Sequence, residues 1–202
     1  SIIGAGGAQR LNAGRGITHS ERPSAKFAKE GGTTEVIQLW VNLPKANKMD
    51  APSYKGVSKE EIPSIQIADG LNLDLISGSY GDQWGAIRAP FPVLLAALEA
   101  AKDATGELSL PNGMQGGLYM INGKGSISGY GIIEEKTFYQ VSNDEGNLKI
   151  SMNGGAKALL LLGQPINEPL ATYGPFVMNT QTEIMESLRD YNQGKIGVLI
   201  EE

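Results

Sequence analysis

Short apolar runs separated by turn-forming residues are the feature of this sequence that most restricts its fold. Glycine accounts for 27 of the 202 residues, well above the usual share of about 7%. The glycines are spread along the chain between short apolar stretches, which indicates many tight turns. Frequent turns between short strands are typical of a barrel or sandwich, so we expect an all-β protein.

Several segments have the composition or the alternation of apolar and polar residues that half-buried strands show. Two dipeptides, Asp69-Gly70 and Asn122-Gly123, lie between such segments and are strong signals for two-residue hairpins. The main expected strands are, in chain order, 35–43, 64–68, 71–76, 117–121, 125–128, 137–142, 147–152 and 156–162.

Residues 93–101 give a mixed signal. Leucine and alanine predominate there, which favours a helix. Pro90 and Pro92 precede the segment, however, and its neighbours are expected strands. We therefore predict a strand, with a helix as the alternative.

A helix is expected near the end of the chain, over residues 179–195. Thr180 and Glu183 have the spacing of a capping box, and Gly194 is expected to end the helix. An amphipathic helix of this kind usually packs on its own sheet, and binding of a partner is the alternative. The apolar residues expected on one helical face are Ile184, Met185, Leu188 and Tyr191.

The charge and composition exclude several functions. A net charge of −5 and a pI near 5.0 argue against binding nucleic acid or a membrane surface. The absence of cysteine excludes disulfides and thiolate ligands, and fits a reducing, cytoplasmic location. The longest apolar run, near residues 156–162, is far shorter than the roughly 20 residues of a membrane span. The first residues lack the pattern of a signal peptide.

Two polar segments are expected to lie in solvent. Residues 22–34 have the composition of a loop, and residues 45–62 that of a long connection. The charged residues of the second segment are therefore interpreted as ordinary surface residues. They are Lys48, Lys55, Lys59, Glu60 and Glu61.

The single histidine of the chain, His19, precedes Glu21 by two residues. On an extended strand these two side chains would point to the same face and could bind one metal ion. A site with two imidazoles and one carboxylate needs a second histidine, which the chain does not contain. A metal role therefore competes with that of an ordinary surface or core residue.

Three further features allow two interpretations each. Gly14 and Gly16 indicate a tight corner more strongly than a phosphate-binding loop, because no strand-loop-helix context surrounds them. Arg15 between them is interpreted as an ion-pairing residue, with anion binding as the alternative. Gln38 and Trp40 alternate along an expected strand, where they would line a cavity, or where Trp40 would pack into the core.

Several of these segments, taken together, resemble the pirin family of the cupin superfamily. Each motif is modest, but their order and spacing match over nearly the whole chain. The matching segments are residues 13–21, 38–44, 48–49, 52–54, 62–63, 163–169 and 174–180.

The resemblance implies a bicupin, two consecutive jelly-roll-type β-barrels with a C-terminal helix. Residues 1–60 would be the later part of the first barrel, with the family's opening strands and His-x-His motif absent. Residues 61–178 would form the second barrel, and residues 179–195 a helix packed on the barrels. Residues 64–202 contain no histidine, so the second barrel is interpreted as structural or as facing a partner.

The resemblance also implies iron or another divalent transition metal, with His19 and Glu21 as two of four protein ligands. Glu21 would be the catalytic residue of a quercetin 2,3-dioxygenase-type enzyme acting on a flavonol-like molecule. With half of the ligands absent, a metal-free module that acts through protein contacts is the alternative. An incomplete barrel leaves open strand edges, so assembly into a homo-oligomer is also expected.

Overall fold

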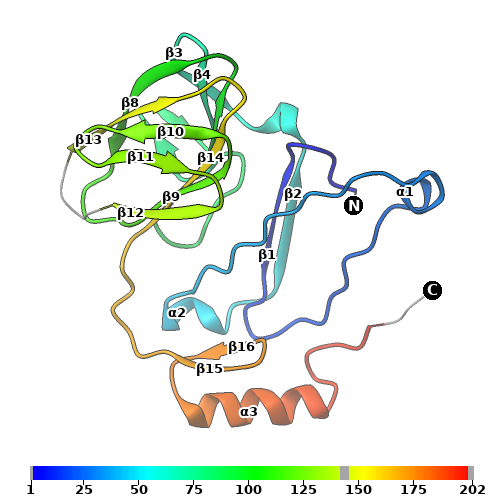
Figure 1. Cartoon of the computed structure of the whole chain (residues 1–202). Helices are drawn as coiled ribbons and strands as arrows, with labels where there is room; N and C mark the ends of the chain where they lie inside the picture. Colours follow the sequence, from blue (N-terminus) through cyan, green and yellow to red (C-terminus); the bar gives the residue numbers. More distant parts are fainter. Residues whose placement is uncertain (1, 142–145, 200–202) are drawn as a thin grey trace. The chain divides into compact units, whose positions relative to one another are not determined.

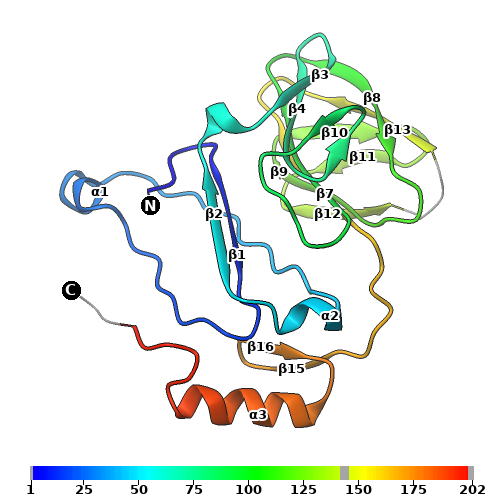
Figure 2. The ribbon, with the colours of Figure 1, turned by 180° about the vertical axis from the view of Figure 1, so that it is seen from behind.

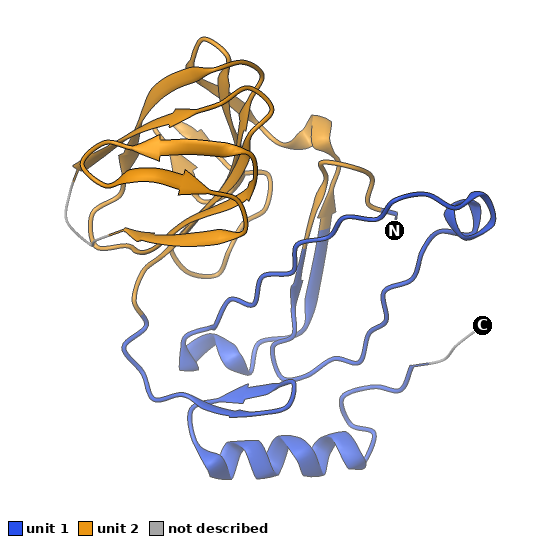
Figure 3. Ribbon diagram, in the orientation of Figure 1, with its two compact units in different colours: residues 1–2, 10–55, 166–202 blue, residues 3–9, 56–165 orange. Residues whose placement is uncertain are grey.

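The computed structural model describes residues 2–141 and 146–199. Strands predominate, and the described helices are few and short apart from one near the C-terminus (Figure 1). The contacts divide the chain into two compact units, unit 1 (residues 1–2, 10–55 and 166–202) and unit 2 (residues 3–9 and 56–165) (Figure 3). The expected all-β fold is confirmed, whereas the barrel boundaries stay a prediction.

Unit 2 contains two antiparallel sheets whose strand orders, among the described residues, are β12-β9-β14-β7-β4-β3 and β11-β10-β13-β8. The larger sheet consists of β3 (Ser64–Ala68), β4 (Leu71–Ser77), β7 (Val93–Ala100), β9 (Gln115–Asn122), β12 (Thr137–Val141) and β14 (Lys157–Gly163). The smaller sheet consists of β8 (Ala104–Leu110), β10 (Lys124–Ile127), β11 (Gly131–Glu134) and β13 (Gly146–Met152).

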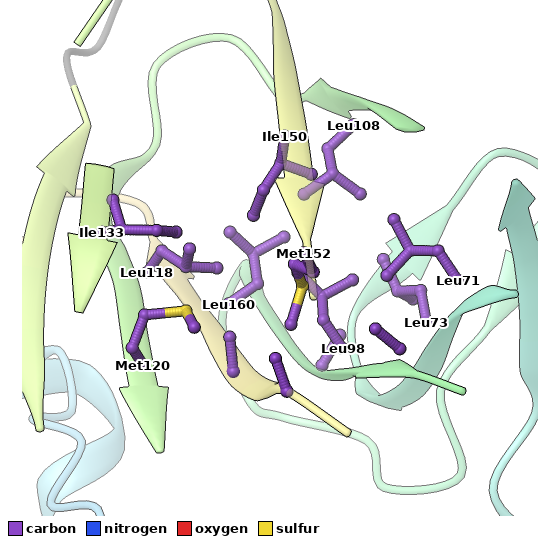
Figure 4. Close-up of a cluster of buried hydrophobic side chains, with 14 of the residues drawn as sticks. Leu71, Leu73, Leu98, Leu108, Leu118, Met120, Ile133, Ile150, Met152 and Leu160 are labelled. Carbon is purple, nitrogen blue, oxygen red and sulfur yellow. The ribbon is translucent and has the colours of Figure 1, made fainter. Parts of the chain in front are cut away.

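Buried aliphatic side chains from both sheets form one core in unit 2 (Figure 4). Complete burial of one such side chain contributes roughly 1.5–3 kcal/mol, so this core is the main source of the unit's stability. The largest fully buried side chains are Leu71, Leu73, Leu75, Leu94, Leu98, Leu108, Leu118, Met120, Ile133, Ile150, Met152 and Leu160.

The strand predicted over residues 93–101 is confirmed as β7. Buried residues recur there at every second position, and β7 lies between β14 and β4. Large and small residues face each other across the ladder, Ala96 opposite Leu160 and Leu98 opposite Ala158. This period of two, with a partner strand on each side, overrides the helix propensity of leucine and alanine.

The two predicted hairpins have different outcomes. Asp69-Gly70 joins the paired strands β3 and β4, as expected. Asn122-Gly123 forms a tight turn but joins β9 to β10, which belong to different sheets, so the predicted hairpin is wrong. The Asn122 side chain donates a hydrogen bond to the Gly155 carbonyl (3.1 Å), and Gly123 has a φ of 80°. The turn thus directs the chain from one sheet to the other.

Smaller elements complete unit 2. A 3-10 helix, η1 (Lys59–Glu61), precedes β3, and the short strands β5 (Ser79–Tyr80) and β6 (Gln83–Trp84) pair with each other. The guanidinium of Arg88 lies 4.2 Å from the ring centre of Trp84. Trp84 is 57% exposed, and unfolding would separate it from Arg88, so its emission reports on this unit.

Unit 1 contains most of the described helices. They are α1 (Ala25–Glu30), α2 (Lys45–Lys48) and α3 (Gln181–Asn192). Two short strands, β15 (Ala171–Tyr173) and β16 (Phe176–Met178), form a hairpin that packs against α3 (Figure 2). In a further pair of strands, β1 (Ala8–Asn12) is hydrogen-bonded to β2 (Ser53–Val57).

The C-terminal helix is confirmed, with Thr180 as its N-cap and Glu183 completing the capping box. The predicted apolar face is only partly correct, because Ile184 is buried whereas Met185 and Tyr191 are exposed. The loop predicted over residues 22–34 contains α1, which Ser24 caps by accepting a hydrogen bond from the Phe27 amide (3.1 Å). No helix in the described part of the chain has the length and apolar character needed to cross a membrane.

The strand predicted over residues 35–43 is wrong. The chain between α1 and α2 forms neither helix nor strand, and both ribbon views draw it as an irregular trace (Figures 1 and 2). A β-branched, aromatic sequence favours a strand only where a neighbouring strand can pair with it. Within the described residues this segment has no such partner.

Unit 1 has little apolar core. Among its described residues, the buried apolar ones are Ala171 and Ile184, and every other buried apolar residue lies in unit 2. The fixed backbone of unit 1 must therefore be stabilised largely by other interactions, because ordering a residue costs roughly 1–2 kcal/mol.

A polar network centred on Lys48 supplies part of this stabilisation. Lys48 is only 5% exposed, so the prediction of an ordinary surface residue is wrong for it. Its ammonium donates hydrogen bonds to Asn42 Oδ1 (2.8 Å) and to the Leu43 carbonyl. Burial lowers the pKa of Lys48 below its usual 10.5, although the carboxylates of Glu168 and Glu183 act in the opposite direction.

The network joins segments that are far apart in sequence. The Lys45 amide donates to Glu168 Oε2 (2.7 Å), and the buried Asn179 side chain donates to the same oxygen (3.1 Å). The Lys45 ammonium lies 3.8 Å from Glu183 Oε1. These contacts link α2 to the region that leads into α3.

The stabilisation that Glu183 provides is expected to depend on pH. Burial raises its pKa, but hydrogen bonds from Thr180 and Asn179 and the charge of Lys45 outweigh that effect, so the pKa lies below its usual 4.5. The native state therefore binds fewer protons than the unfolded state, and the stabilisation is complete above pH 4.5 and lost as pH falls through the lowered pKa. We expect the Thr180 and Asn179 amide NMR signals to titrate with a midpoint below 4.5.

Two variants test this assignment. Glu183→Gln should abolish the titration, whereas Glu186→Gln, at an exposed position of the same helix, should leave it unchanged. A midpoint above 4.5, or a titration that persists in Glu183→Gln, would contradict it.

Candidate functional site

The glycine-rich corner before His19 is a tight turn, as expected. Gly14 has a φ of 50°, and a Cβ on it would lie 2.0 Å from the Asp50 carbonyl oxygen. The Arg15 amide donates to that same oxygen (3.0 Å), and the Gly16 amide donates to the Ala13 carbonyl (2.9 Å). Glycine is required at position 14 because the backbone of residue 50 passes so close.

The segment after the corner contacts the chain beyond α3. The Thr18 hydroxyl donates to the Gly197 carbonyl (3.2 Å). A Cβ on Gly16 would lie 2.7 Å from the Ile196 side chain, so the two segments are in close contact. These contacts fix the chain immediately before His19 against the C-terminal segment of unit 1.

His19 and Glu21 lie in an irregular segment and not in a strand. The condition of an extended strand is therefore not met, and the spacing of two residues does not by itself place both side chains on one face. Both residues are exposed. Their role as metal ligands stays a prediction.

The side chains that could bind a metal do not cluster in the described part of the chain. The described residues contain no group of three or more histidine, cysteine, aspartate or glutamate side chains that could bind one ion. A protein site for a transition metal normally has at least three protein ligands. His19 and Glu21 supply two, so the residues present do not fit a complete site.

Gln38 and Trp40 lie in the irregular segment between α1 and α2. Both are exposed, Trp40 by 63%. Trp40 therefore does not pack into a core within unit 1. The role of Gln38 and Trp40 in lining a cupin cavity stays a prediction.

Two surface hollows in unit 1 involve residues that the sequence did not single out as a group. A polar hollow of about 340 Å³ lies beside the glycine corner and contains an ion pair between Lys195 Nζ and Asp190 Oδ1 (3.0 Å). Its lining residues are Arg15, Gly16, Met49, Pro52, Asp190, Lys195 and Ile196. The sequence offered no signal for it, because its residues come from three distant segments.

The second hollow, of about 420 Å³, lies on α3. It is lined by Tyr173, Met185, Leu188, Arg189, Asn192 and Gln193. Neither of these two hollows is lined by His19, Glu21, Gln38 or Trp40.

Comparison with protein families gives two matches. Residues 1–41 match the Pirin family model, and residues 95–197 match the model of the Pirin C-terminal cupin domain. The second match covers more than half of the chain.

Individual relatives agree with these matches. A Pseudomonas aeruginosa protein named "Putative quercetin 2,3-dioxygenase PA2418" is 34% identical over 196 residues, which cover 96% of this chain and 68% of the relative. The pirin of Rattus norvegicus is 31% identical over 95% of this chain and 65% of its own length. The chain thus spans about two thirds of the length of these relatives.

A solved structure shows the same architecture. The crystal structure of a quercetin 2,3-dioxygenase from Acinetobacter baumannii is 36% identical and superposes with a TM-score of 0.91. The match covers 98% of this chain and 69% of that one.

Proposed function

Because this chain belongs to the pirin family, we propose that it serves as part of a metal-dependent oxygenase of the quercetin 2,3-dioxygenase type. The observation that carries this proposal is the similarity to the Acinetobacter baumannii quercetin 2,3-dioxygenase over nearly the whole chain. A flavonol-like molecule is the proposed substrate. The metal would be iron or another divalent transition metal.

The proposed contribution of this chain to the metal site is His19 and Glu21. A neutral imidazole and a carboxylate are both good ligands for divalent iron, and such ions in oxygenases supply the coordination at which oxygen chemistry occurs. Both residues lie at exposed positions. Two protein ligands alone should bind the ion weakly, so further ligands are required for a stable centre.

A metal-free protein-interaction module is the second candidate. It is favoured by the absence of a three-ligand cluster among the described residues and by the exposed apolar side chains of unit 1. In this alternative, the chain acts through protein contacts and has no oxygenase activity.

Binding of a paramagnetic ion distinguishes the two candidates. On titration of the chain with Mn²⁺, we expect NMR line broadening to begin at the amides of residues 18–22, because His19 and Glu21 provide the ligands. His19→Ala and Glu21→Gln should each reduce this broadening at least several-fold. Glu35→Gln, at another exposed position of unit 1, is the matched control and should have no effect.

Broadening that is unchanged in His19→Ala, or that is centred elsewhere, would reject the ligand assignment and with it the oxygenase proposal for this chain. The metal-free candidate would then be the better account.

A further inference from the structure

The polar hollow beside the glycine corner contains a cation that no carboxylate neutralises. Arg15 lines this hollow, and its guanidinium has no hydrogen-bond or ion-pair partner within residues 2–141 and 146–199. The ion pair predicted for Arg15 is therefore not formed in the described part of the chain. An unpaired guanidinium is available to an anion, because two of its N–H groups match the two oxygens of a carboxylate.

The second cation of the hollow, Lys195, is positioned by the chain that leaves α3. Gly194 has a φ of 70°, a left-handed conformation that turns the backbone away from the helix axis. The Lys195 amide then donates to the Asp190 carbonyl (3.0 Å), and the Lys195 ammonium lies 3.0 Å from Asp190 Oδ1. Two contacts with one residue therefore hold Lys195 at the hollow.

The backbone around the hollow is fixed before any ligand binds. The Arg15 amide donates to the Asp50 carbonyl (3.0 Å). Gly16 lies against the Ile196 side chain, because a Cβ on Gly16 would be 2.7 Å from it. These contacts bring together the three segments that line the hollow, and a preformed site loses little conformational freedom when a ligand binds.

The lining of the hollow favours one class of ligand. Because Lys195 is paired with Asp190, Arg15 leaves one uncompensated positive charge. One such charge neutralises a monoanion, whereas a dianion such as phosphate would keep a charge that is costly to remove from water. The other side chains of the lining are apolar and can contact the body of a ligand. They are Met49, Pro52 and Ile196.

We propose that this hollow binds a small organic monocarboxylate with an apolar body. The carboxylate pairs with the Arg15 guanidinium, the Lys195 ammonium is a second donor, and the apolar body contacts the apolar lining residues. The volume of about 340 Å³ lies within the roughly 300–1,000 Å³ that sites for small ligands occupy. The inference depends neither on metal binding nor on the proposed oxygenase activity.

Titration of the whole chain with benzoate, followed by NMR, tests the proposal. We expect saturable shifts of the amide signals of residues 14–17 and 190–196. The Kd should be in the millimolar range, because Lys195 is 58% exposed and solvent screens the charges. The absence of saturable shifts in these segments would overturn the proposed site.

Three further compounds test the class of ligand. Benzyl alcohol keeps the ring without the charge, and acetate keeps the charge without the ring. Each should bind about tenfold more weakly than benzoate. Binding of benzyl alcohol as tight as that of benzoate, or tighter binding of inorganic phosphate, would overturn the assignment to a monocarboxylate.

Two variants of the lining should have opposite effects on benzoate binding. Arg15→Gln removes the unpaired cation and should weaken binding about tenfold, while the backbone hydrogen bond to Asp50 remains. Asp190→Asn frees the Lys195 ammonium from its carboxylate partner and should tighten binding several-fold. Loss of folding cannot tighten binding, so unchanged or weaker binding in Asp190→Asn would overturn the proposal.

Arg189→Gln is the matched control for Arg15→Gln. It makes the same chemical change in unit 1, at a residue that lines the hollow on α3 and not the polar hollow. Benzoate binding should be unchanged in this variant. Equal weakening in Arg189→Gln and Arg15→Gln would overturn the proposed location, because the ligand would then not distinguish the two hollows.

Discussion

Replacing Leu98 by alanine is expected to destabilise unit 2 by about 2–5 kcal/mol. Leu98 is fully buried on β7, where its ladder partners are Ala158 on β14 and Leu73 on β4. Shortening the side chain removes apolar contacts and leaves a cavity that a core formed by two sheets cannot readily close. Urea unfolding followed through Trp84 emission, in a Trp40→Phe background, measures the change in the free energy of unfolding.

Leu39→Ala is the matched control, with the same chemical change at a position that is 44% exposed in unit 1. Leu39→Ala should change the free energy of unfolding by no more than about 0.5 kcal/mol, as other surface substitutions do. Comparable losses of stability in the two variants would mean that the irregular segment of residues 33–43 is packed as tightly as β7, contrary to the structure.

Lys48→Ala should destabilise the polar network of unit 1 by about 1–3 kcal/mol, because it leaves partly buried oxygen atoms without their hydrogen-bond donor. Asn42 Oδ1 and the Leu43 carbonyl both lose the ammonium, and nearby Glu168 loses a compensating charge. The change should appear as faster amide exchange in residues 45–48 and 168–180, while β7 and β14 in unit 2 keep their protection.

Lys45→Ala provides the control from the same helix. The Lys45 ammonium is largely exposed and lies 3.8 Å from Glu183 Oε1, so its removal should cost about 0–1 kcal/mol. The hydrogen bond from its backbone amide to Glu168 remains in the variant. A larger effect for Lys45→Ala than for Lys48→Ala would contradict the central position of Lys48.

Much of unit 2 could be predicted from the sequence because its local signals agree with its packing. The strands β3, β4, β12, β13 and β14 follow from alternation and turn residues. The connection at Asn122-Gly123 shows the limit of that reasoning. The dipeptide specifies a tight turn, but whether the two strands share a sheet depends on distant partners such as Gly155 and Ala156.

The structure of unit 1 was harder to predict from the sequence, because it depends on contacts between residues that are far apart in the chain. Residues 35–43 have strong strand propensity, yet a strand forms only beside a partner. Lys48 appeared to be an ordinary surface residue, but its ammonium donates a hydrogen bond to Asn42. The carboxylates that act on its pKa, those of Glu168 and Glu183, lie more than one hundred positions away. No local pattern contains that information.

The candidate site was only partly predictable for the same reason. The corner at Gly14 and Gly16 follows from glycine's backbone freedom, and the structure confirms it. Whether His19 and Glu21 converge depends on the backbone of their segment, which is irregular. The ion pair of Asp190 and Lys195 beside Arg15 was not predicted, because its hollow is formed only by folding.

Amide hydrogen exchange of the whole chain is the most direct test of the difference between the two units. Unit 2 has a packed core, whereas unit 1 contains an exposed segment, residues 33–43, with the composition of a strand. We expect strong protection of β4, β7 and β14, and exchange close to the rate of an unstructured peptide for residues 33–43. Protection of residues 33–43 equal to that of β7, in a chain shown to be monomeric, would contradict it.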